Sequence, residues 1–287
     1  MIRTVALVAC CAALAACSPE PSAPPADTGQ VRRVVTFAPH LAEIMFEVGA
    51  GDQLVGVSAW SDFPRAVLEL PEVGDAFTVD LEQLSLLRPD LVLVWASGMP
   101  VHTVDDLRQR GYRVESITTR NLADVAAAMR RVGDLTGHAA EGESAAARFE
   151  SVFDELRKAH ADDEPISVFF QISARPLYTI NREHFISEII SVCGGQGIFD
   201  ELDEFAPPVS VEAVLDRDPE VMLAGANLGA AAFDEWQRWP DMAANRLGNQ
   251  FLLPDETVGR PSPRLTMAAR SVCLALDQAR NNRRDAQ

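Results

Sequence analysis

The chain has 287 residues, of which 47% are hydrophobic and 23% charged, a composition typical of globular proteins. It carries 25 Lys and Arg against 42 Asp and Glu, which gives a formal net charge of −17 at pH 7 with neutral histidine. This excess of acid argues against a nucleic acid or an anionic membrane surface as the partner, and it suits docking onto a basic surface.

Residues 1–16 have the pattern of a secretory signal. An apolar run follows Arg3 and is too short to span a membrane. It ends in Leu-Ala-Ala before Cys17, which is the pattern of a bacterial lipoprotein signal whose cysteine thiol carries the lipid. We predict lipidation at Cys17, and the following Ser18 favours sorting to the outer membrane. An ordinary signal peptide cut near Ala16 is the alternative.

Residues 17–30 are predicted to form a tether that links the lipidated cysteine to a folded body. Proline and small polar residues dominate this stretch, so it cannot build a core and favours an extended, semi-rigid chain. At about 3 Å per residue its reach is at most roughly 40 Å.

Short apolar runs alternate with helical patterns through the rest of the chain, which indicates an α/β fold with parallel sheets flanked by helices. We expect residues 31–137 to form one α/β lobe and residues 165–287 to form a second. The expected strands are Val34–Phe37, Leu54–Val57, Leu91–Val94 and Val114–Ile117 in the first half, and Ile166–Phe170, Tyr178–Ile180, Val221–Leu223 and Phe251–Leu253 in the second.

A single long helix is predicted over residues 138–164, between the two lobes. Ala145, Phe149, Val152 and Leu156 recur at helical spacing, and neither Gly nor Pro interrupts the run after Gly142. Such a rigid connection permits small rocking of the lobes but resists wide hinge closure.

One sequence pattern occurs twice, about 130 residues apart. Asp80 and Ser210 can each cap a helix, and Glu82 and Glu212 then fall in the first helical turn, where the helix dipole favours an anion. In each copy a proline followed by an acid ends the helix before an apolar strand. The pattern predicts a matched pair of exposed acids, one on each lobe. The alternative is that both glutamates only stabilise their helices.

The cysteines are consistent with export. Cys10 and Cys11 leave with the signal and Cys17 is lipidated, so Cys193 and Cys273 remain as an even number in an oxidising compartment. We expect them to form a disulfide, and its loop of about 80 residues would stabilise the fold by about 4.5 kcal/mol.

Aromatic residues follow several predicted strands, where ligands bind in open α/β sheets. Trp60 and Trp95 follow strands of the first half, Phe77 lies in a loop before the first acidic motif, and Tyr178 and Trp236 lie near strand ends of the second half. Aromatic side chains on both lobes suit a large, flat, partly apolar ligand. Core packing is the alternative for Trp95 and Trp236.

The sequence gives little support for an enzyme. It has no Gly-x-Ser-x-Gly elbow, no phosphate-binding Gly-rich loop and no paired-cysteine motif, and Gly194–Gly197 is interpreted as a turn. The five histidines lack metal-ligand spacing, so no metal site is predicted. His40, which follows Pro39 at a strand end, is the exception of interest.

Four motifs occur in a specific order along nearly the whole body. They are Arg33–Glu43, Val55–Val57 with Ser61–Pro64, Asp80–Glu82 with Arg88–Val92, and Val192–Gly195. In this order and spacing the chain resembles the substrate-binding proteins of ABC importers for cobalamin, siderophores and haem. The resemblance implies a bilobed binding protein that delivers its ligand to a permease dimer in the inner membrane.

Within that family the cobalamin binders are the best match. Their aromatic positions fall on Trp60, Trp95 and Tyr178, and Phe77 stands where some of them carry Trp. Either Glu256 or Asp255 stands near the place of a ligand-contacting Asp. Their paired cysteines match Cys193 and Cys273, and the glutamates that dock onto permease arginines match Glu82 and Glu212. Together with the strand-end positions, this resemblance gives a predicted ligand-binding set of Pro39, His40, Trp60, Phe77, Trp95, Tyr178, Trp236, Glu256 and Arg260.

The sequence therefore predicts a monomeric, lipid-anchored periplasmic protein that captures cobalamin or a related corrinoid and has no cofactor or catalytic residue of its own. A ferric siderophore or haem binder of the same fold is one alternative, with Arg260, Tyr178 and His40 as candidate ligand contacts. A second alternative is an envelope scaffold or sensor lipoprotein without a transport role. A hydrolase is disfavoured because no nucleophile motif is present.

Overall fold

The computed structural model describes residues 31–254 and 258–287. The predicted signal, the lipidation site Cys17 and the tether lie outside the described residues, and so does Glu256. Residues 31–287 cluster as one compact unit. Among the residues that the structure describes, no helix combines the length and the apolar character that a membrane crossing requires.

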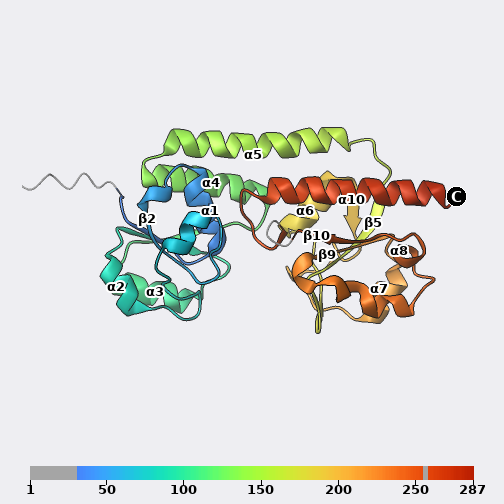
Figure 1. The fold of residues 1–287 in the computed structure, drawn as a ribbon, viewed down its shortest axis with the longest axis horizontal. Coiled ribbons are helices and arrows are strands. Elements are labelled where there is room, and N and C mark those ends of the chain that lie inside the picture. Colours follow the sequence, from blue (N-terminus) through green and yellow to red (C-terminus); the bar gives the residue numbers. More distant parts are fainter. Residues whose placement is uncertain (1–30, 255–257) are drawn as a thin grey trace, which may run out of the picture. The chain divides into compact units, whose positions relative to one another are not determined.

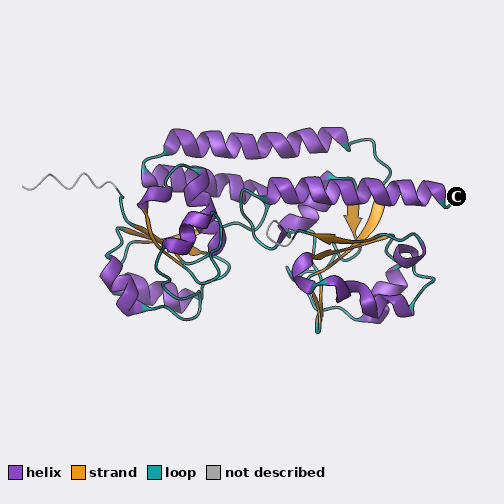
Figure 2. Ribbon diagram, viewed as in Figure 1, coloured by secondary structure: helices purple, strands orange, loops and turns teal. Residues whose placement is uncertain are grey.

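The first half of the body forms a four-stranded parallel sheet in the order β2-β1-β3-β4 with its helices, which we call the N-lobe (Figures 1 and 2). The central strand β3 is buried on both faces, and its unbroken apolar run is typical of a parallel sheet covered by helices on both sides. The strands are β1 (Val34–Thr36), β2 (Leu54–Val57), β3 (Leu91–Trp95) and β4 (Val114–Ile117), and the helices are α1 (Pro39–Glu47), α2 (Leu81–Leu87), α3 (Val101–Gln109) and α4 (Leu122–Thr136).

The second half forms another four-stranded parallel sheet, in the order β10-β9-β5-β8. We call this sheet and its helices the C-lobe. The two sheets confirm the predicted α/β class with parallel strands. The strands are β5 (Ile166–Gln171), β8 (Gly195–Gly197), β9 (Val221–Gly225) and β10 (Gln250–Leu253), and the helices are α6 (Phe185–Val192), α7 (Val211–Arg217), α8 (Ala243–Arg246) and α10 (Leu265–Asp285).

Two segments of the C-lobe differ from the sequence-based expectation. The Gly194–Gly197 run, interpreted as a turn, contains the edge strand β8. A Cβ at Gly195 would lie 2.7 Å from Ile190 and 2.8 Å from Leu276, so glycine lets this strand pack closely on α6 and α10. The strand expected at Tyr178–Ile180 is instead the two-residue β7 (Leu177–Tyr178), which pairs antiparallel with β6 (Ser173–Ala174) outside the parallel sheet.

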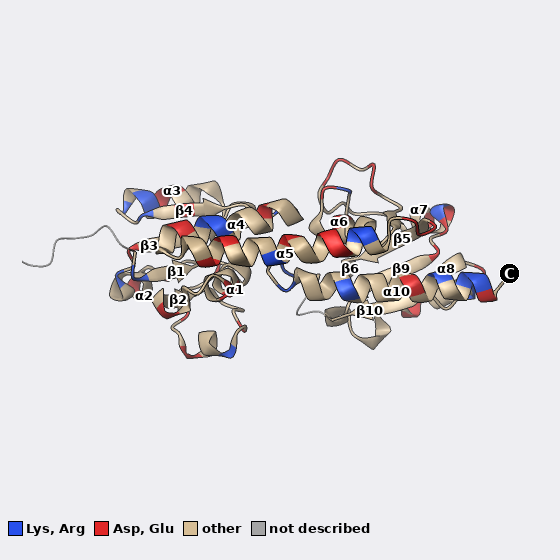
Figure 3. Cartoon of the chain, turned by 90° about the horizontal axis from the view of Figure 1, so that it is seen from above, with Lys and Arg blue, Asp and Glu red and all other residues tan. Residues whose placement is uncertain are grey.

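The helix expected over residues 138–164 is α5 (Ala139–Ala159), which passes along one side of both lobes (Figure 1). Its 21 residues span about 32 Å. It packs closely on α4, where a Cβ at Gly133 would lie 3.0 Å from the Gly142 Cα atom. Acidic and basic residues are interspersed along α5 (Figure 3), and Arg130 on α4 binds Glu143 and Glu150 of α5.

The two lobes share one continuous hydrophobic core beneath α5. This core joins Leu93 of the N-lobe, Phe149 of α5, Val168 and Ile186 of the C-lobe and Leu265 of α10. The disulfide predicted from the sequence is confirmed, because Cys193 at the end of α6 is bonded to Cys273 in α10. The continuous core ties the lobes together directly, in addition to the covalent link through α5.

Candidate ligand site

The repeated sequence pattern forms the same local structure in both lobes. The Asp80 side chain accepts a hydrogen bond from the Gln83 N–H at the start of α2, and Ser210 accepts one from Ala213 at the start of α7. Glu82 and Glu212 are both exposed in the first turn. Helices α2 and α7 lie on the side of their lobes away from α5 (Figure 1). The two acids are therefore equivalent, solvent-facing groups on the two lobes.

The acid that follows the proline in each copy has a role that the sequence did not suggest. Asp90 Oδ2 accepts hydrogen bonds from the Arg32 and Arg33 N–H groups, each 2.9 Å long, before β1. Glu220 Oε2 likewise accepts from the Ser167 N–H, 3.3 Å away, at the start of β5. Each acid thus anchors a neighbouring strand, and this local structural role is the same in both lobes.

Trp95 ends β3 and is held between two neighbours. Its ring packs edge-on against the His40 ring, with centroids 5.2 Å apart. On another side the ring lies over Gly98, where a Cβ would come 2.2 Å from Trp95 Cε3. The Trp95 Nε1 atom is buried and has no hydrogen-bond partner among the described residues. Trp95 is therefore a half-buried aromatic ring in a fixed orientation at the carboxyl end of the N-lobe sheet.

His40 lies beneath this ring in the first turn of α1, next to Pro39. Its side chain is buried, and burial, together with the charge of Arg260, lowers the pKa of His40 to about 3. The imidazole is therefore neutral at any physiological pH. Its Nε2 atom lies 3.3 Å from the Thr119 hydroxyl, so ring and hydroxyl share one hydrogen bond.

Two large aromatic residues project into solvent from neighbouring loops of the N-lobe. Trp60 is 80% exposed and Phe77 is 79% exposed. A backbone hydrogen bond of 2.7 Å from the Ala59 N–H to the Gly74 oxygen joins the two loops. Exposed aromatic side chains gain free energy when a ligand removes them from water, so these two are candidate contacts for an apolar ligand surface.

The C-lobe contributes a small recess at the carboxyl ends of β5 and β9. It has a volume of about 130 Å³, and its walls include Phe170, Ile172, His184, Asn227 and Val258. Tyr178 is half-buried in the short β7 strand near this sheet edge. Strand ends in both lobes thus carry aromatic or imidazole rings, as expected for a ligand site at the ends of parallel sheets.

A family model described as periplasmic binding protein matches residues 34–259 of the chain. The chain belongs to the periplasmic binding protein family. It is similar to the vitamin B12-binding protein of Vibrio cholerae serotype O1, with 33% identity over 245 residues that cover 85% of this chain and 88% of that protein. The vitamin B12-binding protein of Pectobacterium atrosepticum is 31% identical over 254 residues, with the same coverage of 85% and 88%.

Solved structures agree with this assignment. The crystal structure of the periplasmic vitamin B12 binding protein of Vibrio cholerae matches with a TM-score of 0.78 and 32% identity over 87% of this chain and 98% of that one. The periplasmic heme-binding protein RhuT from Roseiflexus sp. RS-1 matches with a TM-score of 0.76 and 24% identity over 87% and 99%. The second match shows that the fold is the same. The sequence-based recognition of the family is therefore confirmed.

One predicted ligand-binding residue of this periplasmic binding protein lies in the core. Trp236 is 2% exposed, and its Nε1–H donates a 2.8 Å hydrogen bond to Gln171 Oε1. Its ring packs against Phe169 with centroids 5.7 Å apart. The sequence-based prediction for Trp236 was wrong because the helical turn that carries it, Ala230–Arg238, folds back onto the C-lobe sheet.

Arg260, also predicted to bind ligand, has its guanidinium group engaged with the N-lobe. Nη1 and Nη2 donate hydrogen bonds of 2.5 and 3.1 Å to the Asp62 carboxylate, and Nη2 also donates to the Trp60 oxygen, 3.0 Å away. These hydrogen bonds lower the pKa of the Asp62 carboxyl. Arg260 therefore fixes the loop that carries Trp60.

A second ion pair between the lobes was not predicted from the sequence. Arg264, at the start of α10, donates hydrogen bonds of 2.9 and 2.7 Å to the two carboxylate oxygens of Glu43 on α1. The Glu43 side chain is only 2% exposed, and Arg260 lies 3.5 Å from it. The only hint in the sequence is an acid inside the apolar run Leu41–Met45.

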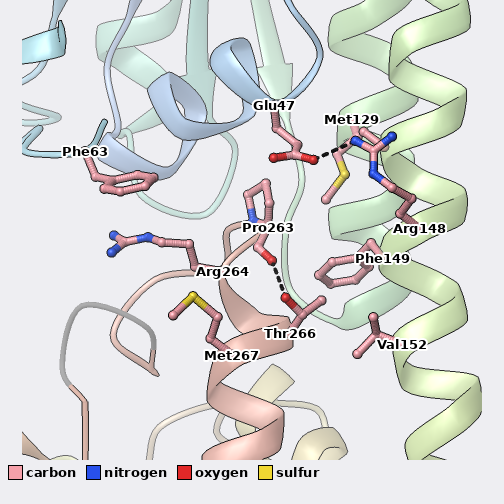
Figure 4. Close-up of a pocket in the computed structure, with 11 residues that line it drawn as sticks. Glu47, Phe63, Met129, Arg148, Phe149, Val152, Pro263, Arg264, Thr266 and Met267 are labelled. Atoms are coloured by element: carbon pink, nitrogen blue, oxygen red, sulfur yellow. Dashed lines mark hydrogen bonds and ion pairs between the residues drawn. The ribbon is translucent and has the colours of Figure 1, made fainter. Parts of the chain in front are cut away.

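The Glu43–Arg264 pair adjoins a cavity of about 690 Å³ between α1, α4, α5 and the start of α10 (Figure 4). Phe149, Met129 and Val152 form one wall, and Phe63 and Met267 lie opposite. None of the predicted ligand-binding residues that the structure describes lines it. We therefore distinguish this cavity from the strand-end site.

The structure also brings together His160, Asp163 and Asp277, whose ligand atoms lie within 4.8 Å of one another. Arg280 occupies the same place, however, with Nη1 at 3.0 Å from Asp163 and 3.1 Å from Asp277. One guanidinium group thus binds both acids, so we interpret the cluster as a structural ion network at the end of α5.

Proposed function

We propose that this protein captures cobalamin or a related corrinoid between its lobes and delivers it to an ABC importer in the inner membrane. The observation that carries the proposal is the Trp95 ring, which His40 and Gly98 hold in one orientation at a strand end. The exposed Trp60 and Phe77 extend the aromatic surface. Aromatic contact area suits a corrinoid because the ligand is large, rigid and partly apolar. The similarity to vitamin B12-binding proteins supports the same ligand class.

The ligand proposal is tested by titrating residues 31–287 with cyanocobalamin and following tryptophan fluorescence and calorimetric heat, with haem and a ferric hydroxamate as competitors. We expect saturable one-to-one binding of cobalamin alone. The Trp60→Ala variant should weaken binding by on the order of 2 kcal/mol, which is about 30-fold, because a large apolar contact is lost. A response to the iron chelate without cobalamin binding would move the function to iron uptake.

We propose that Glu82 and Glu212 are the residues that dock onto basic groups of the permease. Both acids are exposed at equivalent helix starts, on the side of the lobes away from α5. Exposed charges at a docking surface act mainly through electrostatic complementarity with the partner. The Glu82→Ala/Glu212→Ala double variant should lose cobalamin uptake in cells while its affinity for cobalamin in solution is unchanged. Normal uptake by the double variant would contradict the docking role.

We also propose that the protein is a monomer anchored by a lipid on Cys17, in the inner leaflet of the outer membrane. The support is the lipoprotein pattern around Cys17 and the Ser18 that follows it. Labelling cells with a radioactive fatty acid should mark the wild-type protein but not the Cys17→Ser variant. Membrane fractionation then identifies the membrane, and recovery of the label with the inner membrane would overturn the sorting prediction.

A further inference from the structure

His184 lies at the strand-end recess of the C-lobe, and the proposed function gives it no role. The recess is lined mainly by apolar side chains and backbone, and its polar side chains are Gln171, His184 and Asn227. Both polar atoms of the Gln171 amide already have partners, because Nε2 donates to the Ala232 oxygen and Oε1 accepts from Trp236. Asn227 is exposed, so His184 is the partly buried polar residue that can still offer an atom to the recess.

The orientation of the His184 ring is fixed by three contacts. Its Nδ1 atom accepts a 3.1 Å hydrogen bond from the Ile186 N–H, which makes His184 the N-cap of α6. The imidazole also packs against Phe185 and Phe205, with ring centroids 4.2 and 4.6 Å away. Because Nδ1 accepts a hydrogen bond, the proton of the neutral ring is on Nε2. The Nε2–H group has no partner among the described residues.

The electrostatic surroundings favour an uncharged acceptor. Burial lowers the pKa of His184 to about 3, so the ring is neutral. Among the residues that the structure describes, none of those lining the recess is Lys or Arg. Of the charged groups nearby, Arg120 binds Glu183 at 3.1 Å, and Glu188 accepts a hydrogen bond from the Leu122 N–H at 2.7 Å. A carboxylate in the recess would be buried without a counter-charge, whereas an amide oxygen needs only the neutral donor.

We propose that His184 is a specificity-determining residue, whose Nε2–H donates a hydrogen bond to a carboxamide oxygen on the rim of the bound corrinoid. The inference rests on the proposed function, because it assumes that the ligand lies between the lobes. Corrinoids carry amide side chains around the macrocycle, and haem carries carboxylates. His184 thus selects an amide-rimmed ligand over a carboxylate-rimmed one.

The same geometry argues that His184 does not coordinate the ligand's metal. Coordination through Nε2 requires the proton to move to Nδ1. Nδ1–H would then face the Ile186 N–H, and the hydrogen bond that caps α6 would be lost. The donor role keeps the cap intact, so it is the chemistry that this arrangement supports.

The test compares His184→Ser with His184→Asn. Both side chains can still cap α6, but serine has no donor that reaches the recess, whereas asparagine offers an amide N–H. The control is Asp80→Ser, which alters the N-cap of α2 and leaves the recess unchanged. Cyanocobalamin affinity is measured by calorimetry, together with the affinity for a derivative in which side-chain amides are hydrolysed to carboxylates. Thermal melting checks that each variant is folded.

We expect His184→Ser to bind cyanocobalamin about tenfold more weakly, as a lost buried hydrogen bond predicts. His184→Asn should lose less affinity, and Asp80→Ser should lose none. Wild type should discriminate against the carboxylate derivative, and His184→Ser should lose much of that discrimination. The visible absorption of bound aquacobalamin should be the same in wild type and variants.

Two results would overturn this inference without affecting the proposed function. The first is that His184→Ser binds cobalamin as tightly as wild type. The second is an absorption shift of aquacobalamin with wild type but not with His184→Ser, which would mean that His184 coordinates the metal. If the wild-type protein does not bind cobalamin at all, the proposed function fails and the inference fails with it. The wild-type titration therefore separates the two cases.

Discussion

Removing the charge of Arg264 should destabilise the protein far more than removing the charge of an exposed arginine. The Arg264 guanidinium donates two hydrogen bonds to Glu43, whose side chain is 2% exposed. It also stacks on the Phe63 ring, with its central carbon 4.3 Å from the centroid. Arg264→Met keeps an unbranched apolar side chain for this contact and removes the charge. The variant thus isolates the cost of leaving Glu43 without its partner.

The expected magnitude follows from the burial of the pair. Breaking a buried ion pair by removing one partner costs about 3–5 kcal/mol, because the remaining charge is uncompensated. Arg260 remains 3.5 Å from Glu43 and supplies part of the counter-charge. We therefore expect a loss of about 3 kcal/mol in the free energy of unfolding. The matched control is Arg131→Met, whose partner Glu115 is 30% exposed, and it should cost less than about 1 kcal/mol.

Urea unfolding followed by circular dichroism measures both variants. The Glu43→Leu/Arg264→Met double variant should recover most of the lost stability, since replacing both charges by apolar groups removes the buried unpaired acid. A loss below about 1 kcal/mol for Arg264→Met alone would refute the reasoning. It would mean that Glu43 is either solvated or fully neutralised by Arg260.

Three further predictions follow from burial and packing. Both His40 and His184 have a pKa of about 3 in the folded protein, well below the usual value of about 6.5 in an unfolded chain. Between these two pH values the unfolded chain binds more protons, so each histidine should lower the free energy of unfolding by about 1.4 kcal/mol per unit of falling pH. Above pH 6.5 the two histidines should cause no change. Urea unfolding between pH 6.5 and 5 measures this slope, and His184→Asn should halve it. Reducing the disulfide, whose cysteines are 80 residues apart, should lower the free energy of unfolding by about 4.5 kcal/mol, measured with and without reductant. Gly98→Ala would place a Cβ 2.2 Å from the Trp95 ring and should weaken cobalamin binding about tenfold in a calorimetric titration; an unchanged affinity would remove Trp95 from the site.

Much of the fold could be predicted because its strands are short apolar runs bounded by polar residues. β3 and β9 are central strands that are buried apart from Trp95 at the end of β3, and their continuous hydrophobic sequence identifies them without tertiary information. β8 was missed because Gly-Gln-Gly offers no apolar side chain. Its position is decided by close packing on α6 and α10, which only glycine allows, and such contacts are visible only in three dimensions.

The sequence could predict those residues of the candidate site that lie next to the end of a predicted strand. His40 lies shortly after β1 and Trp95 ends β3, and the structure brings their rings together. The ligand-binding prediction for Trp236 was wrong because Trp236 follows β9 in sequence, but the helical segment Ala230–Arg238 directs its side chain into the core. The Arg264–Glu43 pair joins residues 221 positions apart, so no local pattern could reveal it.

The contacts between the lobes bear on how the proposed delivery works. Arg260 and Arg264 bind acids of the N-lobe, Arg120 binds Glu183 of the C-lobe, and the hydrophobic core runs without a break beneath α5. Wide opening would break these ion pairs and expose apolar core surface, at a cost of several kcal/mol. The distance between α2 and α7 is therefore nearly fixed. The two acids that we propose for docking, held at a fixed separation, can engage a permease dimer together, so binding of one raises the effective concentration of the other. A partner that pulled the two helices apart would have to break the inter-lobe ion pairs first.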